Sequence, residues 1–192
     1  MLQSHEIEAQ KDDLILMRPR PAKLVDVNFC CQLNGGYTTA YVWQMRTRET
    51  ERTTDIHFDV VRLPRPMRVD YPRLPDELIE HWEQKGCFLV IHNGDNEIFG
   101  YVDALPQPWQ NTLWVFNLVV APAYRHQGVG SHLLQAARQW AVTNRLGQLT
   151  VELQTKNHPA IALVQKHGFQ FCGYNEQYYP NGDIALFFTR AI

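Results

Sequence analysis

The chain has 192 residues and a mass of 22.4 kDa, the size of one ordinary globular domain. Eighteen Lys and Arg residues stand against 20 Asp and Glu residues, so the net charge of −2 gives no positive field to attract nucleic acid or anionic lipid. No apolar run approaches the roughly 20 residues that a membrane helix needs. We therefore predict a soluble protein without nucleic-acid or membrane partners.

The first residues and the cysteines indicate a cytoplasmic protein. Residues 1–13 form a polar tail that lacks the apolar core of a signal peptide. The chain has four cysteines: Cys30, Cys31, Cys87 and Cys172. Their spacing matches no zinc motif, and four are too few to form a disulfide framework. We predict reduced thiols in the core, no bound metal and a cytoplasmic location.

The first elements are a strand and a helix. Residues 14–18 are apolar and predict a short strand, which two following prolines end. Residues 22–33 place Leu24, Val27 and Cys31 on one helical face, and a nearby glycine is a suitable end.

A hairpin follows. Alternating aromatic and polar residues over 37–47 predict one strand, and residues 56–60 predict its partner across the polar turn at 49–53. Residues 62–73 contain three prolines, which cannot donate to a strand ladder. We expect an extended surface connection there.

A second helix is predicted from Pro75 to Gly86, with Leu78, Ile79 and Trp82 buried. Three strands follow at 87–92, 97–104 and 112–120, and the turn at 93–96 makes the first two antiparallel. The longest helix spans residues 131–146, with Gly147 as its cap.

The remaining elements are a strand at 149–154, a helix at 159–167 and a closing pair at 170–179 and 183–189. A strand–helix–strand crossover joins parallel strands, so 112–120 and 149–154 should run parallel. The order predicts an α+β fold: one domain over residues 14–192 with a mixed, mostly antiparallel sheet flanked by helices.

The stretch from Leu118 to Ser131 carries the clearest functional signal. A strand ends, a turn with two glycines follows, and a long helix begins. The N–H groups at a helix start bind anions, and Gly128 and Gly130 would let a phosphate approach them. Arg125 would add a charged donor. The stretch predicts a diphosphate site.

Two other phosphate loops do not fit this stretch. The P-loop needs a lysine after its last glycine, and the sequence has Ser131 after Gly130. The dinucleotide fingerprint needs a third glycine, where this chain has Leu133.

Two motifs resemble the GNAT superfamily of N-acetyltransferases. Arg125-x-x-Gly128-x-Gly130 resembles its acetyl-CoA signature. Asn157-x-x-Ala160-Ile161-x-Leu163, followed by His167-Gly168-Phe169, resembles its second conserved stretch. The element order is also similar. Residues 67–71 look like the streptothricin acetyltransferases, whereas residues 152–169 and 178–180 look like the ribosomal-protein alanine N-acetyltransferases.

The resemblance implies a GNAT fold whose two central parallel strands splay apart to hold the cofactor arm of acetyl-CoA. It implies that the cofactor contacts Leu118, Val119, Val120, Arg125, His126, Gln127, Gly128, Val129, Gly130, Ser131 and Asn157. Asn157 is also a suitable N-cap for the helix that follows it.

The resemblance also suggests catalytic groups. Glu152 matches the acceptor glutamate of the alanine acetyltransferases and would take the amine proton through water. Asp103 and His57 are alternative bases. In the strand before the glycine turn, where many relatives keep an acid, this chain has Phe116 and Asn117, and neither can act as a base.

The superfamily's usual tyrosine acid is replaced by Val164. Tyr178 is the candidate substitute, and Tyr174 and Tyr179 are alternatives or, like Tyr178 itself, walls of the acceptor site. The hairpin over residues 37–63 is expected to form another wall.

These observations predict an acetyl-CoA-dependent N-acetyltransferase that moves the acetyl group directly to a primary amine of a small molecule or a protein N-terminus. It would act as a monomer or homodimer, without a cysteine intermediate. A catalytically silent acyl-CoA-binding module is the alternative, because the strand acid and the tyrosine are missing. A structural protein without ligand is a third interpretation.

Overall fold

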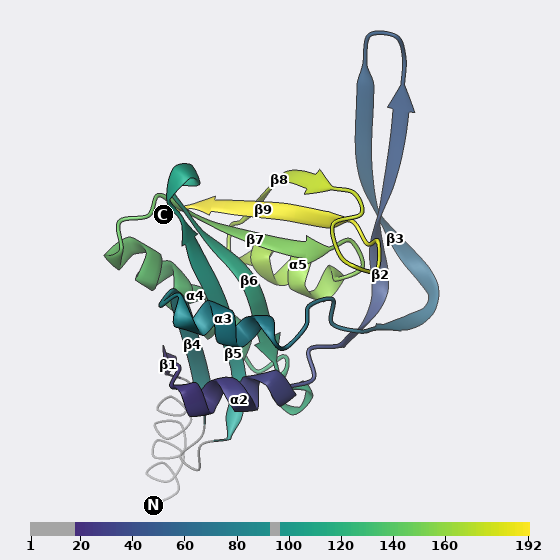
Figure 1. Ribbon diagram of the computed structural model, residues 1–192. Helices are drawn as coiled ribbons and strands as arrows, with labels where there is room; N and C mark the ends of the chain where they lie inside the picture. The colour runs from purple at the N-terminus through teal and green to yellow at the C-terminus, as the bar shows by residue number, and fades with distance from the viewer. Residues whose placement is uncertain (1–17, 93–96) are drawn as a thin grey trace, which may run out of the picture. The chain divides into compact units, whose positions relative to one another are not determined.

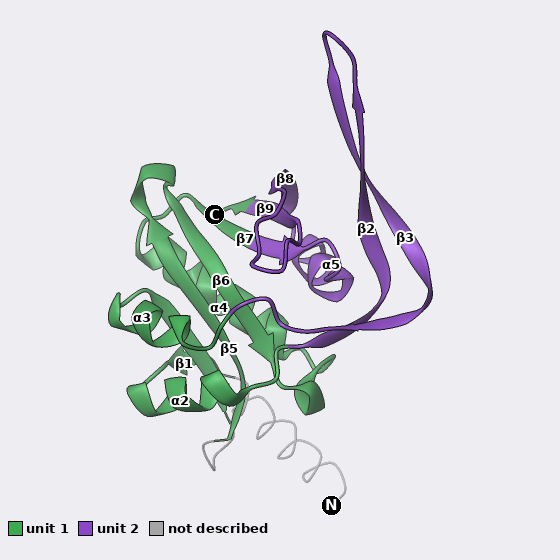
Figure 2. Ribbon diagram, turned by 45° about the vertical axis from the view of Figure 1, so that its right-hand side comes forward, with its two compact units in different colours: residues 1–35, 74–151, 190–192 green, residues 36–73, 152–189 purple. Residues whose placement is uncertain are grey.

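The computed structural model describes residues 18–92 and 97–192 (Figure 1). The chain forms two compact units: residues 1–35, 74–151 and 190–192 belong to unit 1, and residues 36–73 and 152–189 to unit 2 (Figure 2). The strand predicted at 14–18 lies outside the described residues except for Arg18, which is not in a strand, and the predicted turn at 93–96 lies outside them too.

Unit 1 is built on a mixed sheet in the order β1-β4-β5-β6-β7. Its strands are β1 (Arg20–Pro21), β4 (Cys87–His92), β5 (Ile98–Gln107), β6 (Thr112–Val120) and the first residues of β7 (Gln148–Gln154). Neighbouring strands are antiparallel except β6 and β7, whose parallel register runs from Thr112↔Gln148 to Val115↔Val151. The predicted parallel pair is confirmed.

Helices cover both faces of this sheet. Helix α4 (Val129–Thr143) packs on β4, β5 and β6, whereas α2 (Leu24–Gln32) and α3 (Glu77–Glu83) pack together on the other face (Figures 1 and 2). The central strand β5 is consequently buried from Ile98 to Leu105. The apolar face of α4 supplies Leu133, Leu134 and Ala137 to this core.

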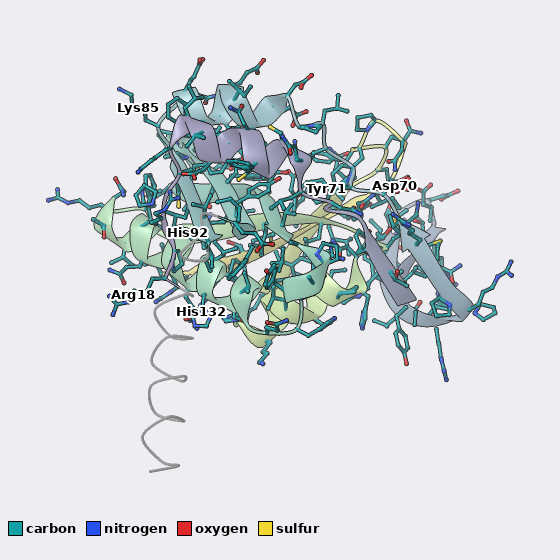
Figure 3. The ribbon with its side chains drawn as sticks, turned by 90° about the horizontal axis from the view of Figure 1, so that it is seen from below. Arg18, Asp70, Tyr71, Lys85, His92 and His132 are labelled. Carbon is teal, nitrogen blue, oxygen red and sulfur yellow. The ribbon has the colours of Figure 1, made fainter. Side chains whose placement is uncertain are left out.

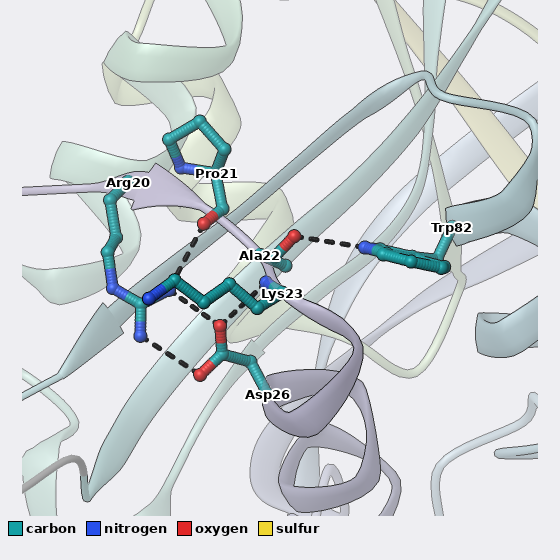
Figure 4. A network of polar contacts seen from close by, with 6 residues as sticks. All are labelled: Arg20, Pro21, Ala22, Lys23, Asp26 and Trp82. Carbon is teal, nitrogen blue, oxygen red and sulfur yellow. Dashed lines mark hydrogen bonds and ion pairs between the residues drawn. The ribbon is translucent and has the colours of Figure 1, made fainter.

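Polar contacts at the start of α2 determine which face of this helix turns toward the core (Figure 4). The guanidinium of Arg20 donates to both oxygens of Asp26, at 2.6 and 2.9 Å, and the backbone N–H of Lys23 donates to Asp26 Oδ2 at 2.7 Å. Asp26 is thereby buried together with Val27 and Cys30, while Leu24 is 51% exposed. The prediction that Leu24 shares the inner face was wrong, because a buried ion pair turns the helix.

Two further predictions for unit 1 need correction. Ile79 is 40% exposed, so the core contact of α3 rests on Leu78. Helix α4 starts two residues earlier than predicted and ends at Thr143 with Asn144 as its cap. Gly147 instead lets the chain pass close to Asn111, because a Cβ at this position would lie 2.6 Å from Asn111 Nδ2.

Unit 2 contains a long antiparallel ribbon of β2 (Tyr37–Glu49) and β3 (Thr54–Val69), which confirms the hairpin. The rest consists of the end of β7, α5 (His158–Lys166), β8 (Gln170–Asn175) and β9 (Ala185–Ala191). The strand order is β7-β9-β8, and β8 and β9 are antiparallel, as predicted.

The connection predicted at 62–73 is mostly strand. β3 continues to Val69, and its register jumps from Tyr41↔Arg62 to Thr39↔Met67. Residues 63–66, which include Pro64 and Pro66, form a bulge outside the paired ladder. The missing N–H groups of the two prolines therefore cost no ladder hydrogen bond. The prolines were therefore compatible with a strand, because they fall in its bulge.

The cysteines differ in burial. Cys30 and Cys87 are buried, as predicted, and burial raises the pKa of Cys87 to about 12. Cys31 is only partly buried and Cys172 is exposed, so a core role was wrong for these two. Cys172 lies on β8, the outer strand of its sheet, where side chains reach solvent.

Candidate active site

The predicted phosphate turn follows β6 directly. A single helical turn (Pro122–Tyr124) leads to Gly128, which is the N-cap of α4 and has φ +90°. Residues other than glycine rarely adopt this left-handed backbone conformation. A Cβ at Gly128 would meet only the imidazole of His132, at 3.6 Å, so the space above the turn is open.

The first turn of α4 is where the sequence predicts the diphosphate site. The bond from His132 N to Gly128 O, at 3.1 Å, closes the first turn of the helix. The backbone N–H groups of a first helical turn point away from the helix and are the ones that can donate to a ligand. His132, labelled in Figure 3, places its Nδ1 3.0 Å from the same carbonyl oxygen. The helix dipole adds positive potential at this end.

Arg125 holds the turn in place. Its Nε donates to the carbonyl of Val120 at 2.9 Å, and a terminal nitrogen donates to the carbonyl of Asn34 at 3.0 Å. Gln127 Nε2 donates to Ala123 O at 2.9 Å. Arg125 therefore connects the turn to the end of β6, and its contact with a phosphate stays a prediction.

Strand β6 changes partners along its length. Its pairs with β7 end at Val115, but its pairs with β5 continue through Val102↔Leu118 to Gly100↔Val120. A register shift leaves Phe116 as the extra residue of a bulge. Residues 118–120 of β6 thus pair with β5 and lie beyond the register with β7. Their contact with the cofactor arm stays a prediction.

In unit 2, Glu152 forms the centre of a buried polar cluster. Its side chain is 1% exposed. Arg73 pairs with Oε1, and the Tyr178 hydroxyl donates to Oε2 at 2.6 Å. A buried carboxylate needs such partners, because an isolated charge would be costly to desolvate. The structure thus joins the two predicted catalytic residues in one hydrogen-bonded pair.

This environment keeps Tyr178 protonated. Burial raises the pKa of Tyr178, and the hydrogen bond to the Glu152 carboxylate raises it further. Tyr179 is 5% exposed, so it belongs to the core of unit 2 and not to an open wall. The ring of Tyr174 packs on Phe58 at 5.4 Å.

The end of β7 is held by a second polar network. Tyr37 donates to Gln154 Oε1 at 2.9 Å, and Gln154 Nε2 donates to Asp183 at 2.7 Å. Lys156 pairs with the same carboxylate at 2.5 Å. These contacts hold the end of β7 at Gln154, two residues after Glu152.

Asn157 is confirmed as an N-cap: its Oδ1 accepts from Ala160 N at 3.2 Å. The neighbouring His158 has a buried Nδ1 without a hydrogen-bond partner among the described residues, a polar atom that a ligand could satisfy. Val164, at the position of the usual tyrosine, is fully buried. It therefore fills the core under α5.

The alternative bases lie in different surroundings. His57 is exposed on β3. Asp103 is buried in unit 1, where it accepts from His81 and Asn117. The sequence did not predict that Arg73 contacts Glu152 or that His81 contacts Asp103. These partners lie 79 and 22 positions away along the chain, and no local sequence pattern indicates such contacts.

Within residues 18–92 and 97–192, the structure shows neither a metal-binding cluster nor a membrane-spanning helix. No group of three or more metal-binding side chains is placed to hold an ion. None of the described helices is long and apolar enough to cross a membrane.

The model of the Acetyltransferase (GNAT) family matches residues 57–169, which is more than half of the chain. The match contains β6, the glycine turn, α4, β7 and α5. The chain belongs to the GNAT acetyltransferase family.

Curated relatives of this GNAT chain include members of both predicted groups. The streptothricin acetyltransferase of Streptomyces lavendulae is 29% identical over 105 residues, 53% of this chain and 56% of that enzyme. A Bacillus subtilis protein assigned as a [ribosomal protein bS18]-alanine N-acetyltransferase is 28% identical over 152 residues, 78% of this chain and 93% of that protein. The chain thus spans little more than half of the streptothricin enzyme.

Solved GNAT structures confirm the fold. A nourseothricin acetyltransferase is 25% identical with a TM-score of 0.76, covering 91% of this chain and 97% of the other. A Bacillus anthracis protein assigned as a streptothricin acetyltransferase, solved in complex with acetyl coenzyme A, is 19% identical with a TM-score of 0.71, covering 91% of this chain and 98% of the other. The predicted α+β GNAT fold with its parallel pair is confirmed.

Proposed function

We propose that this protein transfers the acetyl group of acetyl-CoA directly to a primary amine of a small molecule or a protein N-terminus. The observation that carries the proposal is the open glycine turn between β6 and α4, with Gly128 at φ +90° and the first-turn N–H groups of α4. Membership of the GNAT family supports it, as do relatives named for acetyl transfer to streptothricin and to ribosomal protein bS18.

The proposed cofactor site follows the residues of both predicted motifs. The diphosphate would lie on residues 125–131, held by backbone N–H groups of the glycine turn. The pantetheine arm would pair with the backbone of Leu118–Val120 in unit 1. In unit 2, Asn157 is the residue predicted to contact the cofactor. The complex of the Bacillus anthracis protein with acetyl coenzyme A supports this ligand.

The reaction needs one bond formed and one broken. The amine lone pair attacks the thioester carbonyl carbon, the C–N bond forms, and the C–S bond breaks. The sulfur leaves with the bonding electron pair and takes up a proton, and the nitrogen of the adduct loses one. A thiol with a pKa near 8.5 is a good leaving group, so acid assistance at sulfur can be modest.

The paired Glu152 and Tyr178 fit these two proton transfers. Glu152 would accept the proton of the adduct through water, and Tyr178 would give its hydroxyl proton to the sulfur. The 2.6 Å hydrogen bond between them then provides the path by which the proton on Glu152 returns to the Tyr178 oxygen. Arg73 offsets the Glu152 charge throughout.

A turnover assay tests the proposal. Purified protein is mixed with acetyl-CoA and, in turn, lysine, spermidine and a peptide that begins with alanine, and the release of free thiol is measured. We expect amine-dependent release with at least one of them. Tight CoA binding without release would show a silent binding module instead, and failure to bind CoA would show a protein without this ligand.

A further inference from the structure

Asp183 lies in the loop over residues 176–184, which joins β8 to β9 in unit 2 and carries Tyr178. The backbone carbonyl of Asp183 accepts from the N–H groups of Tyr178, at 3.1 Å, and Tyr179, at 3.3 Å. The backbone of Asp183 therefore closes the turn on which the Tyr178 side chain stands.

The Asp183 side chain binds the end of β7. Its Oδ2 accepts from Gln154 Nε2 at 2.7 Å, and its Oδ1 accepts from Lys156 Nζ at 2.5 Å. Asn181, in the same loop, donates to Oδ2 at 3.0 Å. Gln154 is 1% exposed, and its amide oxygen accepts from Tyr37 at 2.9 Å, so both ends of this amide are held. One carboxylate thus joins the loop to a buried side chain of β7 that is itself fixed.

These contacts form a closed ring with the proposed catalytic pair. Glu152 and Gln154 lie two positions apart on β7, so both side chains project from the same face of the strand. Glu152 accepts from the Tyr178 hydroxyl at 2.6 Å, and Gln154 donates to Asp183 at 2.7 Å. The backbone bond between Tyr178 and Asp183 joins the two contacts on the loop side. The spacing between loop and strand that Glu152 and Tyr178 need is therefore set at a second point, by Asp183.

Tyr178 needs this support because its loop has no hydrogen-bonded ladder of its own. No residue from 176 to 184 belongs to a helix or strand. The Tyr178 ring packs edge-on against Tyr179 and Phe187, with ring centroids 5.2 and 5.6 Å apart. Apolar contacts have little directionality, whereas a displacement of about 1 Å is enough to slow a reaction strongly. The charged hydrogen bonds of Asp183 supply the directional restraint.

Building on the proposed function, we infer that Asp183 is the positioning residue for Tyr178. Through the loop it holds the Tyr178 hydroxyl where it can protonate the sulfur and take a proton back from Glu152. Gln154 connects it to the strand that carries Glu152. Asp183 itself exchanges no proton and contacts no reacting atom.

Asp183→Ala removes the link and leaves the backbone bonds of the loop in place. With the panel amine that the wild type uses fastest, we expect kcat to fall by about tenfold or more, because the Tyr178 hydroxyl loses its fixed place. The KM for acetyl-CoA should stay within about twofold of the wild-type value. Asp183→Asn keeps one oxygen that can still accept from Gln154, so its kcat should be at least about threefold above that of Asp183→Ala.

Asp26→Asn is the control for lost stability. It also breaks a buried ion pair, with Arg20 in unit 1, and it leaves the Tyr178 loop intact. Its kcat should stay within about twofold of the wild-type value. Thermal unfolding shows that each variant is folded at the assay temperature.

A double-mutant cycle distinguishes positioning from a general loss of structure. If Asp183 acts through Tyr178, Asp183→Ala should lower kcat by less than about twofold in a Tyr178→Phe background. A general structural effect would instead lower kcat by the same factor in both backgrounds.

Two results would overturn the inference: a kcat loss below about threefold in Asp183→Ala, or an equal loss in the wild-type and Tyr178→Phe backgrounds. If Asp183→Ala does not fold, Asp183→Asn takes its place in the same cycle, and equal losses overturn the inference again. The wild type and Tyr178→Phe separate this inference from the proposed function. A wild type without thiol release overturns both together. An active wild type with an impaired Tyr178→Phe and an unimpaired Asp183→Ala overturns this inference alone.

Discussion

At the scale of single residues, Glu152 is the clearest test of the unit 2 cluster. Glu152→Gln keeps the shape of the side chain and one acceptor oxygen, which can serve either Arg73 or Tyr178, but it removes the basic carboxylate. We expect kcat to fall by roughly 10²–10⁴. The loss should be similar for amines of different pKa, because every adduct must lose its second proton. Steady-state kinetics measures it, with the exposed Glu83→Gln as the control. Wild-type activity in Glu152→Gln would move the base elsewhere.

Tyr178→Phe removes the hydroxyl and keeps the ring. If Tyr178 protonates the sulfur, kcat should fall by about 100-fold while the KM for acetyl-CoA stays within twofold. The raised pKa of Tyr178 keeps the wild-type hydroxyl protonated through neutral pH and above its ordinary value near 10, so the deficit should be constant from pH 7 to pH 9.

Tyr179→Phe provides the comparison for Tyr178. Because Tyr179 is buried in the core, we expect this change to affect at most the acceptor KM. A larger kcat loss in Tyr179→Phe than in Tyr178→Phe would contradict the assignment of the acid to Tyr178.

At the scale of elements, the glycine turn before α4 makes the strongest prediction. Gly128→Val places a branched side chain over the first-turn N–H groups, and we expect the KM for acetyl-CoA to rise tenfold or more. Gly182→Val is the matched control, because Gly182 also has a positive φ of +80° and open space around it. It shares the backbone strain but lies outside the proposed diphosphate site. An unchanged KM in folded Gly128→Val would refute the site.

The start of α2 predicts a pH-dependent stability. Asp26→Asn should lower the free energy of unfolding by about 1–3 kcal/mol at pH 7, because a buried carboxylate loses its charged hydrogen bonds. The side-chain hydrogen bond of Arg20 lowers the pKa of Asp26 in the folded chain. The contribution is therefore present above the ordinary pKa of about 3.9 and lost as the pH falls through the lowered value. Urea unfolding at pH 7 and pH 3 should show a smaller difference at pH 3.

At the scale of the whole molecule, both units are built from separate stretches of chain, and β7 contributes residues to each. Neither unit is a continuous segment that could fold while the rest of the chain is absent. We therefore expect one cooperative thermal transition. Acetyl-CoA at 100 times its Kd should stabilise the folded chain by about 2.7 kcal/mol, which raises Tm by about 5–10 °C. Two separate transitions, or no shift, would contradict this expectation.

Much of the fold followed from the sequence alone. The bounds of β4 and β6, the order of the elements from α2 to β9, the parallel pair and the N-cap at Asn157 were all predicted. These features depend on hydrophobic period, glycine and proline positions and capping preference, which act over a few neighbouring residues. The same local pattern predicted a phosphate site in the turn before α4, because the groups expected to bind an anion there belong to consecutive backbone positions.

The tertiary structure decided the side-chain clusters and the exceptions. It paired Arg73 with Glu152, 79 positions apart, and His81 with Asp103, 22 positions apart. It also turned Leu24 outward through the ion pair of Asp26 and accommodated two prolines in the bulge of β3. Such contacts depend on strand register and helix rotation, which are set by the packing of distant elements. The sequence alone therefore determined the fold and predicted the phosphate turn, whereas only tertiary packing could bring together the side chains proposed to transfer protons.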